Sequence, residues 1–215
     1  MVTSASLILL IVELLSILFV ALGLMASAQT RLSGAQAEEL MSSLSEAAAS
    51  MQTMQCRFVQ QKSLSMLADQ LVSEGKMCYV SPDKMRWEYI KPYSFALIVN
   101  GDLIVKVTDG VEEKLDGKSS RMYQGLVSVI MGSASGKKMF DTSLFDVALY
   151  DDDPFWKAEM NPKRRDMKRM FSQLVFYFNK ETQVIGQVDL VETSGDVTSI
   201  QFMDIKLNEA IEEGF

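Results

Sequence analysis

Residues 75–101 read GKMCYVSPDKMRWEYIKPYSFALIVNG, and this stretch decides the fold of the chain. Within it, Met85, Trp87 and Tyr89 alternate with charged residues, which is typical of a β-strand with one buried face. The alternation returns over residues 95–99 and ends at Asn100-Gly101, a common hairpin turn. The stretch therefore predicts consecutive antiparallel strands.

The same alternation continues along most of the chain. A strand is expected from Cys56 onward, and polar turn residues such as Asp109-Gly110 and Gly195-Asp196 separate the later ones. Those later strands are expected at Leu103 to Val107, Leu144 to Tyr150, Met170 to Asn179, Val184 to Glu192 and Thr198 to Leu207. Many short strands with polar turns predict a mainly β fold, in which one antiparallel sheet curls on itself.

Two segments have helical periodicity instead. Ser33 and Gln36 have the spacing of a capping box, and apolar residues then recur at helical spacing, which predicts an amphipathic helix over residues 34–54. Residues 121–131 (RMYQGLVSVIM) predict a short helix that stops at Gly132. Such a helix either covers the open face of the sheet or merely connects two strands.

The first 28 residues have the pattern of a targeting segment. Residues 7–25 are apolar except for Glu13 and Ser16, and Ala26-Ser27-Ala28 ends the run. This is the pattern of a cleavable signal peptide, with a single domain left at 29–215. The alternative is an uncleaved membrane anchor, against which Glu13 counts because a carboxylate is costly within a bilayer. Secretion would place the domain in an oxidising compartment.

Composition excludes several functions. The 215 residues include no histidine, so catalytic mechanisms that depend on histidine, and most zinc sites, are excluded. The 21 basic and 28 acidic residues give a net charge of −7, which argues against a nucleic-acid partner. No spacing singles out an acidic dyad or a lysine nucleophile. We therefore expect no catalytic residues, no metal, no cofactor and no enzyme activity.

The two cysteines invite a geometric hypothesis. If the first hairpin turns near residues 67–68, the paired residue numbers sum to about 134, and Cys56 faces Cys78. A disulfide between them is one expectation, and two buried thiols are the other. A small register error would remove the bond.

The inward faces of the expected strands carry large, soft side chains. The chain has 15 methionines, and an unbranched thioether side chain can repack around variable apolar ligands. Such residues line either a cavity for acyl chains or an ordinary solid core. The inward residues that we expect are Phe58, Met77, Met85, Trp87, Tyr89, Phe95, Leu97 and Val99, together with Phe140, Phe145, Phe171 and Phe176.

The opening stretch also resembles the signature region of a known family. The spacing Pro82-x(4)-Trp87-x(4)-Pro92 is similar to that of the outer-membrane lipoprotein carriers, the LolA-like periplasmic chaperones. Supporting similarities are Phe58-x-Gln60 upstream and the run from Val188 to Phe202 downstream. The resemblance covers most of residues 29–215.

This resemblance implies a half-open antiparallel β-barrel with an N-terminal amphipathic helix and a short helical lid. It implies that Met85, Trp87, Tyr89 and Leu97 line a lipid cavity, and that the lid carries Leu126, Val129 and Ile130. It further implies a monomeric periplasmic carrier in a Gram-negative bacterium. Its expected partners are acylated lipoprotein cargo, an inner-membrane lipoprotein-releasing transporter and an outer-membrane acceptor.

One position departs from the family pattern. Well-studied members have, just before the first proline, an arginine that holds the lid closed, and here the residue is Ser81. The nearby Arg86 has the strand parity of an outward residue. The departure leaves room for a carrier of another amphiphile, such as a glycolipid or a lipid-linked metabolite. A membrane-anchored adaptor with a solid core is the alternative from another class.

Two charged runs have simpler interpretations. Asp151-Asp152-Asp153-Pro154 lacks the spaced ligands of a known calcium loop, which favours a solvated turn. Residues 163–169 contain Lys163-Arg164-Arg165 and Lys168-Arg169, the basic run of the chain. This run fits either a solvated hairpin tip or a contact with an anionic surface.

Overall fold

The computed structural model describes residues 29–66, 69–115 and 139–211. The expected signal peptide and the expected lid, including Leu126, Val129 and Ile130, lie outside these residues. Within the described part of the chain, no helix is long and apolar enough to cross a membrane.

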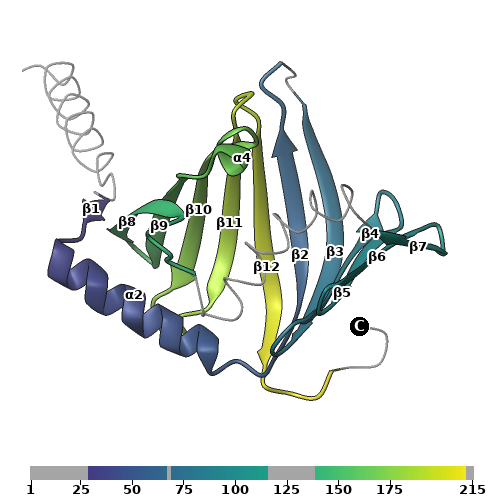
Figure 1. Ribbon diagram of the computed structural model, residues 1–215, viewed down its shortest axis with the longest axis horizontal. Helices are drawn as coiled ribbons and strands as arrows, with labels where there is room; N and C mark the ends of the chain where they lie inside the picture. Colours follow the sequence, from purple (N-terminus) through teal and green to yellow (C-terminus); the bar gives the residue numbers. More distant parts are fainter. Residues whose placement is uncertain (1–28, 67–68, 116–138, 212–215) are drawn as a thin grey trace, which may run out of the picture.

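The described residues form one antiparallel sheet that curls on itself, with a single long helix against it (Figure 1). The strand order is β1-β8-β9-β10-β11-β12-β2-β3-β4-β5-β6-β7. The helices are α2 (Gly34–Ala49) and α4 (Arg165–Lys168). The strands are β1 (Thr30–Arg31), β2 (Thr53–Ser63), β3 (Gln70–Val80), β4 (Lys84–Lys91), β5 (Phe95–Asn100), β6 (Leu103–Thr108), β7 (Val111–Leu115), β8 (Phe145–Asp152), β9 (Phe155–Pro162), β10 (Phe171–Asn179), β11 (Ile185–Glu192) and β12 (Val197–Leu207).

The sequence predicted this mainly β, curled antiparallel architecture correctly. Local side-chain and backbone chemistry explains where the helix starts and where the hairpins turn. At the start of α2, the Ser33 backbone N–H and hydroxyl both donate to Gln36 Oε1, at 3.2 and 2.7 Å. The β6–β7 hairpin turns at Asp109 and Gly110, whose φ angles are +50° and +80°, the left-handed conformation that a tight two-residue hairpin requires.

The helix is shorter than the predicted range of 34–54. It ends at Ala49, and β2 begins at Thr53. Met51 and Met54 continue the helical spacing of apolar residues in the sequence, but in the structure both pack against apolar side chains of the sheet. The Gln52 and Thr53 backbone N–H groups donate to the side chain of Asn208, at 2.7 and 3.4 Å. These contacts with a distant part of the chain hold residues 52–53 at the start of β2 and keep them out of the helix.

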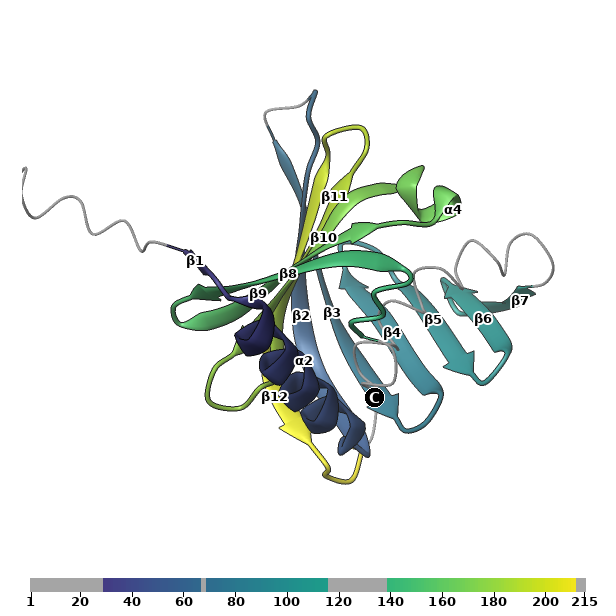
Figure 2. The same cartoon turned by 60° about the vertical axis from the view of Figure 1, so that its left-hand side comes forward.

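The inner face of the sheet carries two apolar clusters. Cluster A lies on β2–β6 and β12, and its buried members include Phe58, Met77 and Trp87. Cluster B lies on β8–β11, where α2 covers it with Leu40 and Leu44 (Figure 2). The two clusters share one face, because Ile200 of cluster A pairs with Val188, which packs against cluster B.

The structure separates the predicted inward residues between these clusters. Phe145 and Phe176 are buried in cluster B, and Phe140 and Phe171 are partly buried against it. They do not join the residues of the opening stretch in a single lining. The sequence argument placed all of them along one face but could not tell which half the helix would cover.

Candidate lipid-binding face

The eight residues assigned to the cavity lining gather in cluster A. Strand register places Met85 opposite Val99, Trp87 opposite Leu97 and Tyr89 opposite Phe95. Trp87 also faces Met77 on the neighbouring strand. Phe58, Met77, Met85, Trp87, Leu97 and Val99 are buried, while Tyr89 and Phe95 are partly buried and pack against them.

Aromatic rings form the centre of cluster A. The Phe58 ring lies 4.3 Å from the Trp87 ring and 5.3 Å from the Tyr89 ring, in an edge-to-face contact with the latter. Phe202 of β12 meets Trp87 edge-on at 6.1 Å. Rings that bury this much apolar area supply much of the affinity of apolar binding surfaces.

A glycine makes room for this aromatic packing. Gly75 lies between Phe58 and Tyr89 in the strand register, so its missing side chain leaves a gap on the inner face. A Cβ atom at Gly75 would lie 2.3 Å from Phe58 Cζ and 2.1 Å from the Glu88 carbonyl oxygen. The Phe58 ring therefore covers the backbone at this point.

A cavity of about 140 Å³ lies where the two clusters meet. Its walls include Ala48 from the end of α2, Met51 and Met54 from cluster A, and Met139 and Phe178 from cluster B. Thr182, Gln183 and Asn208 add polar groups to its walls. An apolar cavity of roughly 150 Å³ accepts a molecule of the size of benzene. The space therefore suits a segment of an acyl chain, and a whole chain requires the cavity to widen.

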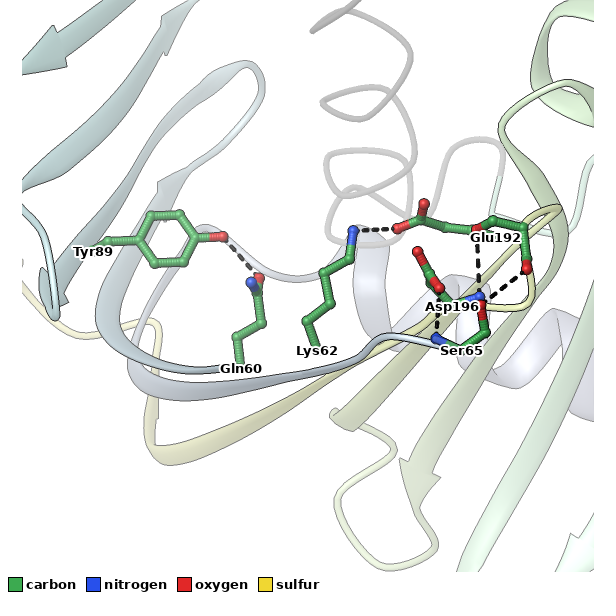
Figure 3. A network of polar contacts seen from close by, with 7 residues as sticks. Gln60, Lys62, Ser65, Tyr89, Glu192 and Asp196 are labelled. Atoms are coloured by element: carbon green, nitrogen blue, oxygen red, sulfur yellow. Dashed lines mark hydrogen bonds and ion pairs between the residues drawn. The ribbon is translucent and has the colours of Figure 1, made fainter. Parts of the chain in front are cut away.

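Polar groups line the inner face at the end of β2 nearest the β2–β3 hairpin (Figure 3). The Tyr89 hydroxyl donates to Gln60 Oε1 at 2.8 Å, and burial raises the pKa of Tyr89 to about 12, so this group stays a donor. Lys62 Nζ lies 2.7 Å from Glu192 Oε1. The sequence indicated Gln60 only through the motif Phe58-x-Gln60. It gave no sign of the Lys62–Glu192 pair, because these residues are 130 positions apart and no local pattern predicts such a contact.

Of the two expectations for the cysteines, the structure contradicts the Cys56–Cys78 disulfide and has free thiols. Cys56 pairs with Met77, and Cys78 pairs with Gln55, so the register sum is 133 instead of 134. This shift of one residue puts the two side chains on opposite faces of the sheet. Both thiols are free, and burial raises the pKa of the Cys56 thiol to about 12.

The structure supports the predicted orientation of Arg86. This residue pairs in register with Cys78, on the outer face, and its guanidinium binds Glu88 at 2.7 Å. Ser81 lies in the β3–β4 turn, where its backbone N–H donates to the Gln52 carbonyl at 2.8 Å. Neither residue gives the inner face the cation that the family latch would use.

The two charged runs lie away from cluster A. Lys180 Nζ binds Asp151 at 2.6 Å and Asp153 at 2.9 Å, so one ammonium offsets part of the negative charge of the acidic run at the β8–β9 hairpin. Across the described ranges, no group of three or more acidic or cysteine side chains could hold a metal ion. The basic run forms the β9–β10 connection and includes α4.

The sequence of this chain matches that of a known protein family. The sequence model described as "Outer membrane lipoprotein carrier protein LolA" matches residues 49–215. The chain belongs to the outer-membrane lipoprotein carrier family. A curated outer-membrane lipoprotein carrier protein from Methylobacillus flagellatus is 25% identical over 139 residues, which are 64% of this chain. The match spans 64% of the length of that relative.

Solved structures with a similar fold are distant in sequence from this carrier-family chain. A LolA superfamily protein from Nitrosomonas europaea is 11% identical, with a TM-score of 0.45 over 81% of this chain and 94% of its own. MucB, in the Pseudomonas aeruginosa MucA/MucB complex, is 13% identical, with a TM-score of 0.47 over 83% of this chain and 59% of its own. The Mycobacterium tuberculosis lipoprotein LppX is 10% identical, with a TM-score of 0.43 over 81% and 98%.

Proposed function

We propose that this protein is a periplasmic carrier that shields the acyl chains of lipoproteins and moves them from the inner to the outer membrane. The observation that supports this most is cluster A, a face of aromatic and methionine side chains in a member of the lipoprotein carrier family. The proposal assigns the protein no catalytic step.

The energetics of transfer explain why such a carrier is needed. Each buried CH₂ group contributes about 0.8 kcal/mol, so a 16-carbon chain exposed to water would lose about 12 kcal/mol. An acylated protein therefore cannot cross an aqueous compartment uncovered. Cluster A supplies an apolar surface of matching chemistry, and its methionines, including Met77 and Met85, can adapt to chains in different positions.

Uptake requires movement, because the cavity of about 140 Å³ is too small for a whole chain. The proposed lid, with Leu126, Val129 and Ile130, would open to admit cargo. The proposal also assigns residues 1–28 to a cleaved signal peptide. It takes an inner-membrane transporter and an outer-membrane acceptor as partners of a monomer.

The two tryptophans allow a direct test of where acyl chains bind. Trp87 lies in cluster A, whereas Trp156 packs against cluster B, where Lys180 lies 4.8 Å above its ring. A Trp156→Phe variant leaves Trp87 as the only indole emitter, and a Trp87→Phe variant leaves Trp156. A fatty acid with a bromine or nitroxide quencher along its chain should quench Trp87 strongly and Trp156 weakly.

Equal quenching in the two variants, or none in either, would overturn the assignment of cluster A as the acyl site. Trp87→Glu gives a second measurement, because a charge among these apolar walls should abolish binding of the fatty acid. Its matched control is Met203→Glu, which places the same charge on β12 where Met203 is 38% exposed. Far-UV circular dichroism would show whether both variants fold.

A second candidate function keeps the fold and changes the cargo. Ser81 replaces the arginine of the family latch, and Arg86 is paired with Glu88 on the outer face, so opening need not follow the family mechanism. The cargo could then be a glycolipid or a lipid-linked metabolite. Native mass spectrometry of protein purified gently from the periplasm would separate the two: an added lipoprotein mass supports the first, and an added lipid mass the second.

The same spectrum tests the membrane-anchored adaptor. A chain that begins at Gln29 would exclude the uncleaved anchor. A full-length chain that is recovered from the membrane fraction instead, and that takes up no fluorescent fatty acid after extraction, would favour the adaptor over both carriers.

A further inference from the structure

The inner face changes from apolar to polar along the strands. On β2, the inward positions are Met54, Cys56, Phe58, Gln60 and Lys62, in that order. The first three are buried members of cluster A, and the last two are polar. An extended molecule lying along β2 would therefore meet an apolar surface first and a hydrogen-bonding surface at its end.

On the neighbouring strands, the inward side chains also change from apolar to polar beside Gln60 and Lys62. Ser73 of β3 pairs with Gln60, and Thr198 of β12 pairs with Lys62. Glu192 follows the buried Leu190 by two residues on β11. Ser73 and Thr198 are 6% and 8% exposed, so the polar zone extends into the buried part of the face and is not confined to its solvated rim.

The charged pair of this zone bridges strands that are not adjacent. Lys62 on β2 and Glu192 on β11 meet over β12, with 2.7 Å between Nζ and Oε1. The pair is drawn in Figure 3. The two side chains are 31% and 30% exposed, so an incoming ligand can reach both. One ammonium has three donors and one carboxylate about four acceptor positions, which leaves capacity beyond the pair itself.

We infer that the polar zone of Gln60, Lys62, Thr198 and Glu192 binds the head of an amphiphile, and that it selects an uncharged, ester- or amide-linked head over an anionic one. The inference rests on the proposed function, because cluster A must hold the acyl chains. Lys62 would donate to a carbonyl oxygen of the head, and Glu192 would accept from its hydroxyl or amide group.

Charge balance is the reason for this selectivity. The opposite charges of Lys62 and Glu192 cancel, so the pair offers an anion no net attraction. Asp196 lies within electrostatic range of Lys62, and a hydrogen bond from the Ser65 backbone lowers its pKa, which keeps this second carboxylate ionised. An anionic head would meet two carboxylates and one cation, whereas a neutral ester meets only donors and acceptors.

The test compares two amphiphiles of equal chain length in the mature protein. Dodecanoate and monododecanoylglycerol each displace a fluorescent fatty-acid probe, and the ratio of their dissociation constants reports selectivity for the head. The wild-type protein should prefer the glyceride. Glu192→Gln, which leaves Lys62 uncompensated, should shift the ratio toward dodecanoate by about tenfold. Lys62→Gln should shift it in the opposite direction.

An ion pair on the outer face supplies matched controls. Lys91 Nζ lies 3.0 Å from Glu74 Oε2 on exposed side chains, so Glu74→Gln and Lys91→Gln make the same charge changes away from the zone. Their ratios should equal the wild-type ratio. Unchanged ratios in the Lys62 and Glu192 variants, with both amphiphiles still bound, would overturn this inference alone. If the wild-type protein binds neither amphiphile, the proposed function fails and the inference fails with it.

Discussion

Replacing Gly75 with alanine tests how the central aromatic packing of the sheet is built. The added Cβ would lie 2.1 Å from the Glu88 carbonyl oxygen and 2.3 Å from Phe58 Cζ. Moving the Phe58 ring away from this Cβ would disturb its contact with Trp87, whose ring centroid lies 4.3 Å away. The Glu88 carbonyl belongs to β4, which pairs with β3 beside Gly75, so it cannot shift without disturbing that pairing.

Both contributions can be estimated. Overpacking a filled interior costs about 1–3 kcal/mol, and the contact with the backbone favours the upper part of that range. Loss of an aromatic contact adds about 0.5–1.5 kcal/mol. We therefore expect Gly75→Ala to lower the free energy of unfolding by about 3 kcal/mol. For a domain of this size, this lowers the melting temperature by about 6–12 °C.

Gly186→Ala is the matched control, because Gly186 also lies within a strand but has space. Its Cβ would lie 3.8 Å from Phe155 Cε1, an ordinary contact. The control should be as stable as the wild-type protein, or more stable by up to about 1 kcal/mol through a less flexible unfolded chain. Urea unfolding followed by circular dichroism measures both. Equal midpoints for the two variants would refute the argument that Phe58 and the β4 backbone close over Gly75.

Three further predictions concern single residues. The native protein should show two free thiols under non-reducing conditions, with Cys78 alkylated faster than the buried Cys56; a single mass shift for a disulfide would contradict the register. Folding raises the pKa of Tyr89 from 10 to about 12. The contribution of the protonated hydroxyl to the stability of the fold is therefore complete below about pH 10 and is lost as the pH rises toward 12. Tyr89→Phe should flatten this decline in stability, as measured by urea titrations between about pH 10 and 12. Asn208→Ala removes an acceptor for the Gln52 N–H from a residue with a φ of +57°, so thermal melts should show a loss of about 1–3 kcal/mol. A melt identical to that of the wild-type protein would exclude this contribution.

The sequence predicted most of the strands whose inner and outer faces differ. β4 alternates Met85, Trp87 and Tyr89 with Arg86 and Glu88, and its pattern shows directly which face is buried. β9 was missed, although Trp156, Ala158 and Met160 alternate with Lys157 and Glu159 in its sequence FWKAEMNP. In the fold, Lys157 and Glu159 form an ion pair at 2.9 Å on its outer side.

The cysteine error shows how far pairing can be read from a hairpin. Placing the turn near residues 67–68 was close enough to identify β2 and β3 as partners. The faces of the residues within each strand were right as well, since Phe58, Met77 and Trp87 all lie in cluster A. Direct partners in an antiparallel pair lie on the same face, so Phe58 and Met77 can both point inward only if the register sum is odd. The inward assignments therefore already excluded a sum of 134, and with it the opposition of Cys56 and Cys78.

The position of the cavity connects the packing to the proposed transport. It lies at the junction of the two clusters, and Met51, Met54 and Met139 contribute to its walls. Methionine side chains can change rotamer at little energetic cost, so this junction can widen more easily than the aromatic centre around Phe58 and Trp87. A chain that entered here would part the end of α2 from the sheet and leave the pairing of β2 with β3 intact. Cargo could then be released without disturbing the sheet, which a carrier that must both bind and give up its lipid requires.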